Sequence, residues 1–141
     1  MDLYSRRIVG WSLAKRIDSD LTGRALAMAI HLRQPQAGLI FHSDRGSQYT
    51  SQDYQDLLDT MGFRPSMSGV GACYDNAVVE CFFGSLKHEW VLQMAQPDRD
   101  RMKHEVTDYI RHYNMDRLLM ACGYMSPVQY ELSHLKVSVN V

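Results

Sequence analysis

The sequence predicts an α/β protein in which short strands alternate with longer helices. Three runs rich in β-branched or aromatic residues have the length of strands, at positions 8–13, 39–41 and 63–68. The segments that follow these runs carry apolar residues every three or four positions, as on one face of a helix. This alternation is typical of a sheet with helices packed against it.

The first part of the chain predicts a turn, a strand and a helix in that order. Tyr4–Arg7 is the turn, and residues 8–13 form the strand. Asp18, Ser19 and Asp20 are candidate caps for an alanine-rich helix over Leu21–Arg33, which Pro35 ends. The residues expected to face inward from this helix are Leu26, Ala29, Ile30 and, as a further candidate, Leu32.

The central stretch opens with a buried-strand candidate, residues 39–41, that leads into Asp44 and the turn residues after it. A carboxylate at the end of a strand in an open α/β sheet lies where ligand sites usually form. Thr50 and Asp53 have a spacing close to that of a capping box. The helix after them should bury Tyr54, Leu57, Leu58 and Met61 and stop at Gly62.

A second helix is expected to carry Glu80 in its first turn, after a cap at Asp75 or Asn76. Glu80, Gly84 and Lys87 recur at i, i+4 and i+7, so they share one face, and the glycine opens space between the two charges. A metal-binding carboxylate and a phosphate-steering ammonium would suit this layout, but so would a solvated helix face. The apolar face comprises Val79, Phe82, Phe83, Leu86 and Trp90.

The remaining segments are expected to support the two elements that carry Asp44 and Glu80. The glycine-containing stretch 66–74 is either a mobile loop beside a site or a plain surface connection. Pro97 breaks the chain, Ser126-Pro127 starts a short helical turn, and residues from about 116 to 141 form a C-terminal tail. A helix over Arg99–Asn114 should bury Met102, Val106, Tyr109, Ile110 and Tyr113.

Composition predicts one domain over residues 1–141, in a protein of the cytoplasm with no membrane association. The chain is 45% hydrophobic and 22% charged, and it has neither a signal-peptide pattern nor an apolar run long enough for a bilayer. Cys73, Cys81 and Cys122 form no C-x-x-C pair, which argues against disulfides and structural zinc. Six scattered histidines predict surface or hydrogen-bonded positions rather than metal ligands.

The net charge of −1 argues against a strongly basic, autonomous DNA-binding protein. Basic residues cluster only locally, at 6–7, 15–16 and 99–103. Any DNA affinity that does not depend on sequence should therefore be weak and sensitive to salt.

Two motifs, HSDRGSQYTS and DNAVVECFFGSLKHEW, resemble the catalytic core of bacterial insertion-sequence transposases, which are related to retroviral integrases. MDLYSRRIVGW and YNMDRLLMACGYMSPVQYE also look like segments of this family, so the resemblance covers nearly the whole chain. The family's second and third catalytic carboxylates match Asp44 and Glu80, which are separated by the 35 residues from 45 to 79. Its basic residue, seven positions after the glutamate, matches Lys87.

The resemblance implies an RNase H-like integrase core, a mixed sheet flanked by helices. It also implies two Mg²⁺ or Mn²⁺ ions held by three carboxylates, which drive cleavage and joining of DNA strands at transposon ends and target. Asp44 and Glu80 would be catalytic metal ligands, and Lys87 would hold a DNA phosphate. Arg45 and Asn76, inside the two motifs, are further candidate DNA contacts.

The sequence departs from the family pattern at its beginning. The family's first catalytic aspartate precedes the segment that matches MDLYSRRIVGW, and Asp2 matches a different position. We therefore expect a chain that is truncated at its N-terminus, lacks the first strand and is defective in catalysis. The open edge of the Asp44 strand predicts that another copy or a rearranged segment fills the gap, or that the protein is poorly stable. The expected protein partners are a second copy of the chain or full-length transposase.

Three other functions compete with this interpretation. The chain could be a non-catalytic remnant that binds full-length transposase and inhibits its assembly. An unrelated nuclease of the RNase H superfamily is disfavoured by the specific pattern of the Glu80 helix. A Ser-His-Asp hydrolase is weaker still, because Ser47 lacks a nucleophile-elbow context.

Overall fold

The computed structural model describes residues 1–69, 76–95 and 98–137. The chain divides into two compact units, one over Val9–Ala77 and one that combines Met1–Ile8 with Val78–Val141. We call them the strand unit and the helical unit and describe each by itself. The prediction of a single domain over 1–141 stays a prediction.

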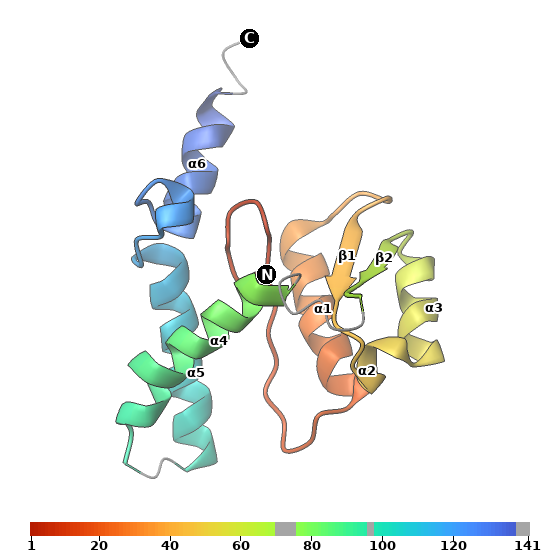
Figure 1. Cartoon of the computed structure of the whole chain (residues 1–141), viewed down its shortest axis with the longest axis horizontal. Coiled ribbons are helices and arrows are strands. Elements are labelled where there is room, and N and C mark those ends of the chain that lie inside the picture. Colours follow the sequence, from red (N-terminus) through yellow and green to blue (C-terminus); the bar gives the residue numbers. More distant parts are fainter. Residues whose placement is uncertain (70–75, 96–97, 138–141) are drawn as a thin grey trace. The chain divides into compact units, whose positions relative to one another are not determined.

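In its described residues the strand unit contains a two-stranded parallel sheet and three helices (Figure 1). The strands pair in register, with His42 opposite Ser66 and Ser43 opposite Met67. In Figure 1 they lie between the long helix α1 and the shorter helix α3. In chain order the elements are α1 (Ser19–Arg33), β1 (Ile40–Ser43), α2 (Ser47–Thr50), α3 (Gln52–Thr60) and β2 (Arg64–Met67).

An aromatic and aliphatic cluster holds the strand unit together. Complete burial of one such side chain contributes about 1.5–3 kcal/mol to folding. Leu32 and Leu57, which the sequence placed inward, are instead 49% and 36% exposed. Leu57 lies about 100° around α3 from the buried Leu58, and Leu32 lies about 200° around α1 from Ile30, which packs on the cluster. Both side chains therefore face solvent. The buried members are Leu26, Tyr54, Leu58 and Phe63, with Ile30, Phe41, Tyr49 and Met61 packed against them.

The helix ends in this unit follow local chemistry. The side chain of Asp18 accepts a hydrogen bond of 2.8 Å from the backbone N–H of Leu21 and caps α1. Gly62 follows α3 with a φ of +68°, a conformation that glycine adopts without strain. The cap predicted at Thr50 is wrong, because Thr50 ends α2 and Ser51 is the N-cap of α3.

The strand predicted at residues 8–13 is also wrong, because none of these residues pairs in a ladder in the part of the chain that the structure describes. The side-chain amide of Asn114 instead forms the hydrogen bonds of the Ile8 backbone. Its oxygen accepts from the Ile8 N–H, and its nitrogen donates to the Ile8 carbonyl, both at 2.9 Å. A residue of a neighbouring antiparallel strand would form the same two hydrogen bonds with the backbone of Ile8. The segment therefore stays extended without belonging to a sheet.

The helical unit is built from three α-helices and two short 3-10 turns among its described residues. The N-terminal segment packs into it, because the Ser5 hydroxyl and the Arg7 guanidinium both donate to Glu131, at 2.7 and 2.8 Å. Where the sequence predicted one helical turn after Ser126, a helix of 11 residues forms. The elements are α4 (Ala77–Glu89), η2 (Val91–Gln93), α5 (Arg99–Met115), η3 (Met120–Cys122) and α6 (Pro127–Val137).

Residues on α4 and α5 form most of the core of the helical unit. Predicted inward positions Val106, Tyr109, Ile110 and Tyr113 on α5 are all buried, as are Phe82 and Leu86 on α4. The thiols of Cys81 and Cys122 are both free. Cys73, the cap candidate Asp75 and Pro97 lie outside the described residues.

No helix in the described residues combines the length and the apolar character that crossing a bilayer requires.

Replacing Gly10 by alanine should destabilise the protein. A Cβ at Gly10 would lie 2.1 Å from the carbonyl oxygen of Ala25 on α1, so the segment and the helix would have to separate. We expect a loss of about 1–3 kcal/mol in the free energy of unfolding, measured with urea. Gly23→Ala is the matched control. A Cβ there meets nothing within 4 Å, so this variant should gain about 0.5–1 kcal/mol from helix propensity. Equal effects of the two changes would contradict the packing of Gly10 on α1.

Candidate functional site

Asp44 lies one residue beyond the end of β1 and is exposed. Its Oδ1 atom accepts a hydrogen bond of 2.9 Å from the backbone N–H of Gly46, which turns the chain toward α2. Among the described residues, no bond is recorded for the other carboxylate oxygen. The turn therefore fixes Asp44 while leaving Oδ2 available to a ligand.

A histidine joins the two strands beside Asp44. The Nδ1 atom of His42 lies 3.0 Å from the hydroxyl of Ser66, and its Nε2 atom lies 3.2 Å from the hydroxyl of Ser68. Because a hydroxyl can donate or accept, both ring nitrogens find a partner in the neutral tautomers. Sequence analysis assigned no role to His42. The available signal was its place two residues before Asp44 in the HSDRG motif.

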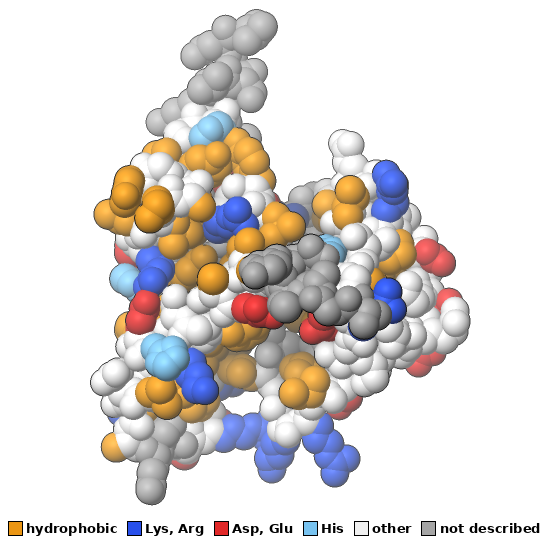
Figure 2. Space-filling view, in the orientation of Figure 1, with side chains coloured by type: hydrophobic (Ala, Val, Ile, Leu, Met, Phe, Trp, Pro, Cys, Tyr) orange, Lys and Arg blue, Asp and Glu red, His pale blue; other side chains and the backbone are white. Residues whose placement is uncertain are grey.

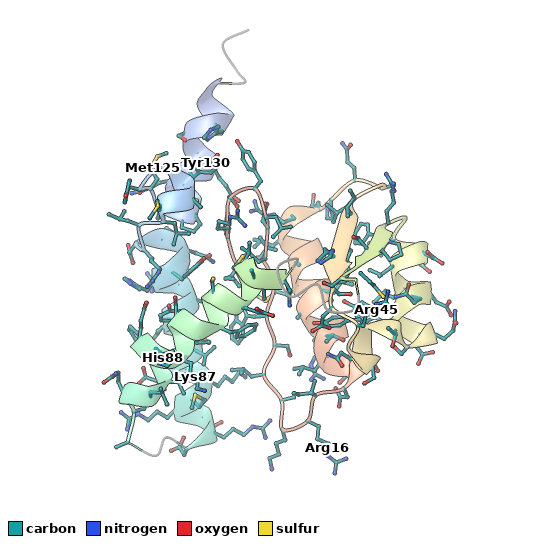
Figure 3. The ribbon with its side chains drawn as sticks, in the orientation of Figure 1. Arg16, Arg45, Lys87, His88, Met125 and Tyr130 are labelled. Carbon is teal, nitrogen blue, oxygen red and sulfur yellow. The ribbon has the colours of Figure 1, made fainter. Side chains whose placement is uncertain are left out.

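Arg45 also contacts the end of β2. Its Nε atom donates to the carbonyl oxygen of Ser68 at 3.0 Å, and Figure 3 shows the side chain beside the strands. The backbone N–H of Ser68 in turn donates to the Ser43 carbonyl at 3.1 Å. Arg45, predicted as a DNA contact, thus has a structural bond through Nε, while its terminal guanidinium nitrogens have no bond recorded in the described part.

The aromatic cluster lies close to the Asp44 turn. Tyr49 packs against Phe41 and Tyr54, with ring centroids 6.4 and 5.5 Å apart. Burial raises the pKa of Tyr49, and the negative charge of Asp44 raises it further. The Tyr49 phenol therefore stays protonated at neutral pH and remains a hydrogen-bond donor close to the carboxylate.

Glu80 and Lys87 are both exposed and share one face of α4. At about 100° per residue, seven residues return the helix to within about 20° of the same direction. A Cβ added to Gly84, between them, would meet nothing within 4 Å, which agrees with the predicted open space. Figure 3 shows Lys87 extending from the later part of α4, with His88 beside it.

The buried face of α4 is narrower than the sequence predicted. Phe82 is 5% exposed, but Phe83 is 59% exposed, so the prediction that Phe83 faces inward is wrong. The two positions differ by about 100° around the helix, and Phe83 touches Phe82 edge-on, at 5.4 Å between centroids. The aromatic rings of α5 contact Phe82, at 4.9 Å for Tyr113 and 6.0 Å for Tyr109.

A polar network attaches the C-terminal end of α4 to α5 and to the loop after it. Both terminal nitrogens of Arg117 donate to the carboxylate of Glu89, one of them at 2.7 Å to Oε1. The hydroxyl of Tyr109 donates to the same carboxylate at 3.2 Å. The next residue, Trp90, donates its indole N–H to Glu105 at 2.8 Å. Sequence analysis did not identify this network.

The Arg117 hydrogen bonds lower the pKa of Glu89 below its ordinary value, against a smaller opposing effect of burial. They also raise the pKa of Arg117. Burial raises the pKa of Tyr109 to about 12. All three groups are therefore in the protonation state that the network needs at neutral pH.

The predicted site residues are divided between the two units. Asp44, Arg45 and the half-buried Asn76 belong to the strand unit, and Glu80 and Lys87 belong to the helical unit. Within the described residues, no group of three or more His, Cys, Asp or Glu side chains is arranged to hold a metal ion. The meeting of Asp44 and Glu80 stays a prediction.

The donor atoms at both carboxylates fit a hard divalent cation. Mg²⁺ and Mn²⁺ prefer oxygen ligands such as carboxylates. Glu80 has no ion pair recorded in the described residues, and Asp44 keeps one oxygen without a recorded bond. Basic side chains, blue in Figure 2, are interspersed with acidic and uncharged side chains on the visible face of each unit.

Two family models, both described as integrase core domain, match this chain. They cover residues 1–73 and residues 80–135, and so include Asp44 in one match and Glu80 in the other. The chain belongs to the integrase core domain family. This confirms the relationship that the HSDRG and DNAVVE motifs indicated.

Curated relatives of this integrase core are encoded by bacterial insertion sequences. The transposase InsF of insertion sequence IS3A from Escherichia coli strain K12 is 43% identical over 136 residues, which are 96% of this chain and 47% of the relative. The insertion element IS600 uncharacterized 31 kDa protein of Shigella sonnei is 41% identical over 130 residues, 92% of this chain and 48% of the relative. The chain thus spans about half the length of these relatives.

A solved structure supports the fold. A chain in the cryo-EM structure of the simian T-cell lymphotropic virus intasome in complex with PP2A regulatory subunit B56 gamma aligns with a TM-score of 0.68 at 21% sequence identity. The alignment covers 83% of this integrase core and 41% of that chain. The predicted RNase H-like α/β fold is confirmed at this level, with a sheet of two strands in the described residues.

Glu89→Gln should remove part of the acid sensitivity of the fold. Because the folded state lowers the pKa of Glu89, its carboxylate stabilises the fold above its ordinary pKa of 4.5, and that stabilisation is lost as the pH falls through the lowered value. The difference in unfolding free energy between wild type and variant should be constant near neutral pH and shrink below pH 4.5. Urea unfolding at a series of pH values measures it, and Tyr109→Phe should show a smaller change of the same sign. Parallel pH curves for wild type and Glu89→Gln would contradict the ion pair.

Proposed function

We propose that this integrase core acts in DNA transposition, through phosphoryl transfer at carboxylates Asp44 and Glu80. The observation that carries the proposal is the pair of family matches, since Asp44 lies in one matched segment and Glu80 in the other. The exposed positions of both side chains support it, as does the shared face of Glu80 and Lys87 on α4. Cytoplasmic action on transposon ends and target DNA belongs to the same proposal.

Each residue has a role in this proposal. Asp44 and Glu80 would hold two Mg²⁺ or Mn²⁺ ions, which supply Lewis-acid activation of the attacking oxygen and stabilisation of the leaving oxygen. Lys87 binds a non-bridging phosphate oxygen and orients the DNA backbone at Glu80. Arg45 directly follows Asp44, Asn76 precedes Glu80 by four residues, and both would contact the DNA strand. Tyr49 keeps its proton beside Asp44 and can hold a solvent or phosphate oxygen in place.

These 141 residues supply matches to two of the family's three carboxylates. With one ligand fewer, the two-metal arrangement loses charge and rigidity, so cleavage by the chain alone should be weak. Incubating the purified protein with Mg²⁺ or Mn²⁺ and supercoiled plasmid tests this expectation. Efficient nicking that Asp44→Asn abolishes would establish a fully active site in these residues and contradict the proposed defect.

Asp44→Asn and Glu80→Gln should each weaken Mn²⁺ binding by about tenfold or more, because each removes a negatively charged ligand oxygen while keeping the shape of the side chain. Electron paramagnetic resonance of free Mn²⁺ measures the binding. Asp59→Asn, which removes an exposed carboxylate at the end of α3, is the control and should leave the affinity unchanged. If neither site variant differs from wild type, the metal role of this pair is wrong.

Lys87→Ala should weaken the binding of a short DNA duplex and reduce the slope of log affinity against log salt by about one, as expected for one lost phosphate contact. Fluorescence anisotropy at several salt concentrations gives both quantities. Lys103→Ala removes an exposed lysine of α5 that is outside the family motif and serves as the control. An unchanged salt slope in Lys87→Ala would rule out the phosphate contact.

A second function, binding to full-length transposase without catalysis, is favoured by the outer edge of β1. In the described residues β1 pairs with β2 on one side only. Ile40, the first residue of β1, is 62% exposed, and Leu39 before it is 44% exposed. Such an edge can accept a further strand. The same edge could pair with a second copy of the chain.

Ile40→Lys should therefore abolish both dimerisation and capture of full-length transposase, because a charge on an edge strand blocks pairing. Light scattering after size exclusion and a pull-down with the tagged transposase measure the two effects. Leu92→Lys, at an exposed apolar position in η2, is the control and should retain both interactions. A wild-type chain that is monomeric and captures no transposase would exclude this function.

A further inference from the structure

We propose that Glu89 and Arg117 are positioning residues, which fix the rotation of α4 about its axis and thereby the direction in which Glu80 and Lys87 point. The functional value of that direction rests on the proposed function, but the geometric claim does not. All the residues involved lie in the helical unit.

The first step is the placement of the residues around α4. Glu89 follows Glu80 by nine residues, which is a rotation of about 180°. It lies at i+7 from Phe82 and i+3 from Leu86, on the side of the helix that carries these two residues, both of which are 9% exposed or less. The polar network therefore contacts the side of α4 that is opposite to the face carrying Glu80 and Lys87.

The second step is the cost of an acid at this position. Glu89 is the last residue of α4, where the helix dipole disfavours a negative charge. Glutamate is favourable here because Arg117 offsets that charge with two parallel hydrogen bonds. The planar guanidinium of Arg117 binds this carboxylate through two hydrogen bonds of fixed direction. We infer that the pair serves to fix the orientation of the end of α4.

The third step separates geometry from stability. The Arg117 and Glu89 side chains are 27% and 43% exposed, and ion pairs this accessible contribute little to folding free energy. A bidentate pair nevertheless restricts direction, and the hydroxyl of Tyr109 adds a third donor from α5 at 3.2 Å. The indole of Trp90, bound to Glu105 at 2.8 Å, adds a second point of attachment one residue later.

The fourth step is the nature of the packing between α4 and α5. The contacts are between large rings, with Phe82 against Tyr113 and Trp90 against Tyr109 at 4.9 and 5.5 Å between centroids. The hydrophobic part of this burial is non-directional, and the edge-to-face preference of the rings constrains the rotation of α4 less tightly than a bidentate hydrogen bond does. Directional hydrogen bonds at the end of α4 remove that freedom.

Residual dipolar couplings of backbone amides in residues 78–89 and 99–115 test the geometric claim in the full chain. Glu89→Gln and Arg117→Lys should change the couplings of α4 relative to those of α5, because each variant disrupts the fork while keeping the size of the side chain. Val106→Ala is the control: it destabilises the core without touching the network and should leave the relative orientation unchanged. Unchanged α4 couplings in both network variants would overturn the proposal.

A double-mutant cycle with Lys87→Ala links the geometry to DNA. Lys87 and Glu89 point in opposite directions, so a purely stabilising role for Glu89 predicts independent effects on affinity for a short duplex. Positioning predicts that the fold-change caused by Lys87→Ala shrinks toward one in the Glu89→Gln background. An identical fold-change in both backgrounds would overturn positioning. If Lys87→Ala has no effect even in wild type, the proposed phosphate contact fails, and the dipolar couplings alone decide the positioning claim.

Discussion

The strand unit depends on burial of the aromatic and aliphatic cluster beneath its two strands. Two parallel strands of four residues are not stable by their own ladder. Leu26 from α1 and Leu58 from α3 meet Phe63 at the start of β2, and this contact brings the strands into register. The register then sets His42 opposite Ser66, and the end of β1 presents Asp44. The position of the carboxylate is thus a consequence of apolar packing several residues away.

The helical unit solves a related problem by different means. Its catalytic candidate Glu80 lies in the first turn of a helix, where neither a strand nor a turn can fix it. The helix itself has to be held, and large rings on one side with a polar network at the far end do so. The two carboxylates are therefore positioned in different ways. The pairing of β1 with β2 fixes Asp44, whereas the orientation of α4 about its axis fixes the direction of Glu80.

Much of this architecture could be predicted from local sequence signals. Asp18, before an alanine-rich segment, caps the start of α1, and Gly62, after Met61, follows the end of α3. The 3- and 4-residue spacing from Val106 to Tyr113 corresponds to the buried face of α5. The family motifs identified the integrase core because they combine several residue types at fixed spacing. Such signals act over a few residues and need no knowledge of distant partners.

The failures concern contacts between distant residues. A β-branched segment such as 8–13 has strand propensity, but it becomes a strand only if a neighbour pairs with it, and here Asn114 takes that place for Ile8. Phe83 and Leu57 are as apolar as their buried neighbours, and only the width of the covered face decides which is exposed. The Glu89 network joins residues up to 28 positions apart, so no local pattern reveals it.

The bond between Asn114 and Ile8 has an implication for sequence variation. The amide of Asn114 recognises main-chain atoms alone, so this bond sets no requirement on the side chain at position 8, apart from excluding proline, which has no N–H. Position 114 has the opposite character. An aspartate there could accept but not donate, and an alanine could do neither. Divergent members of the family should accordingly vary more freely at the recognised residue than at the residue that recognises it.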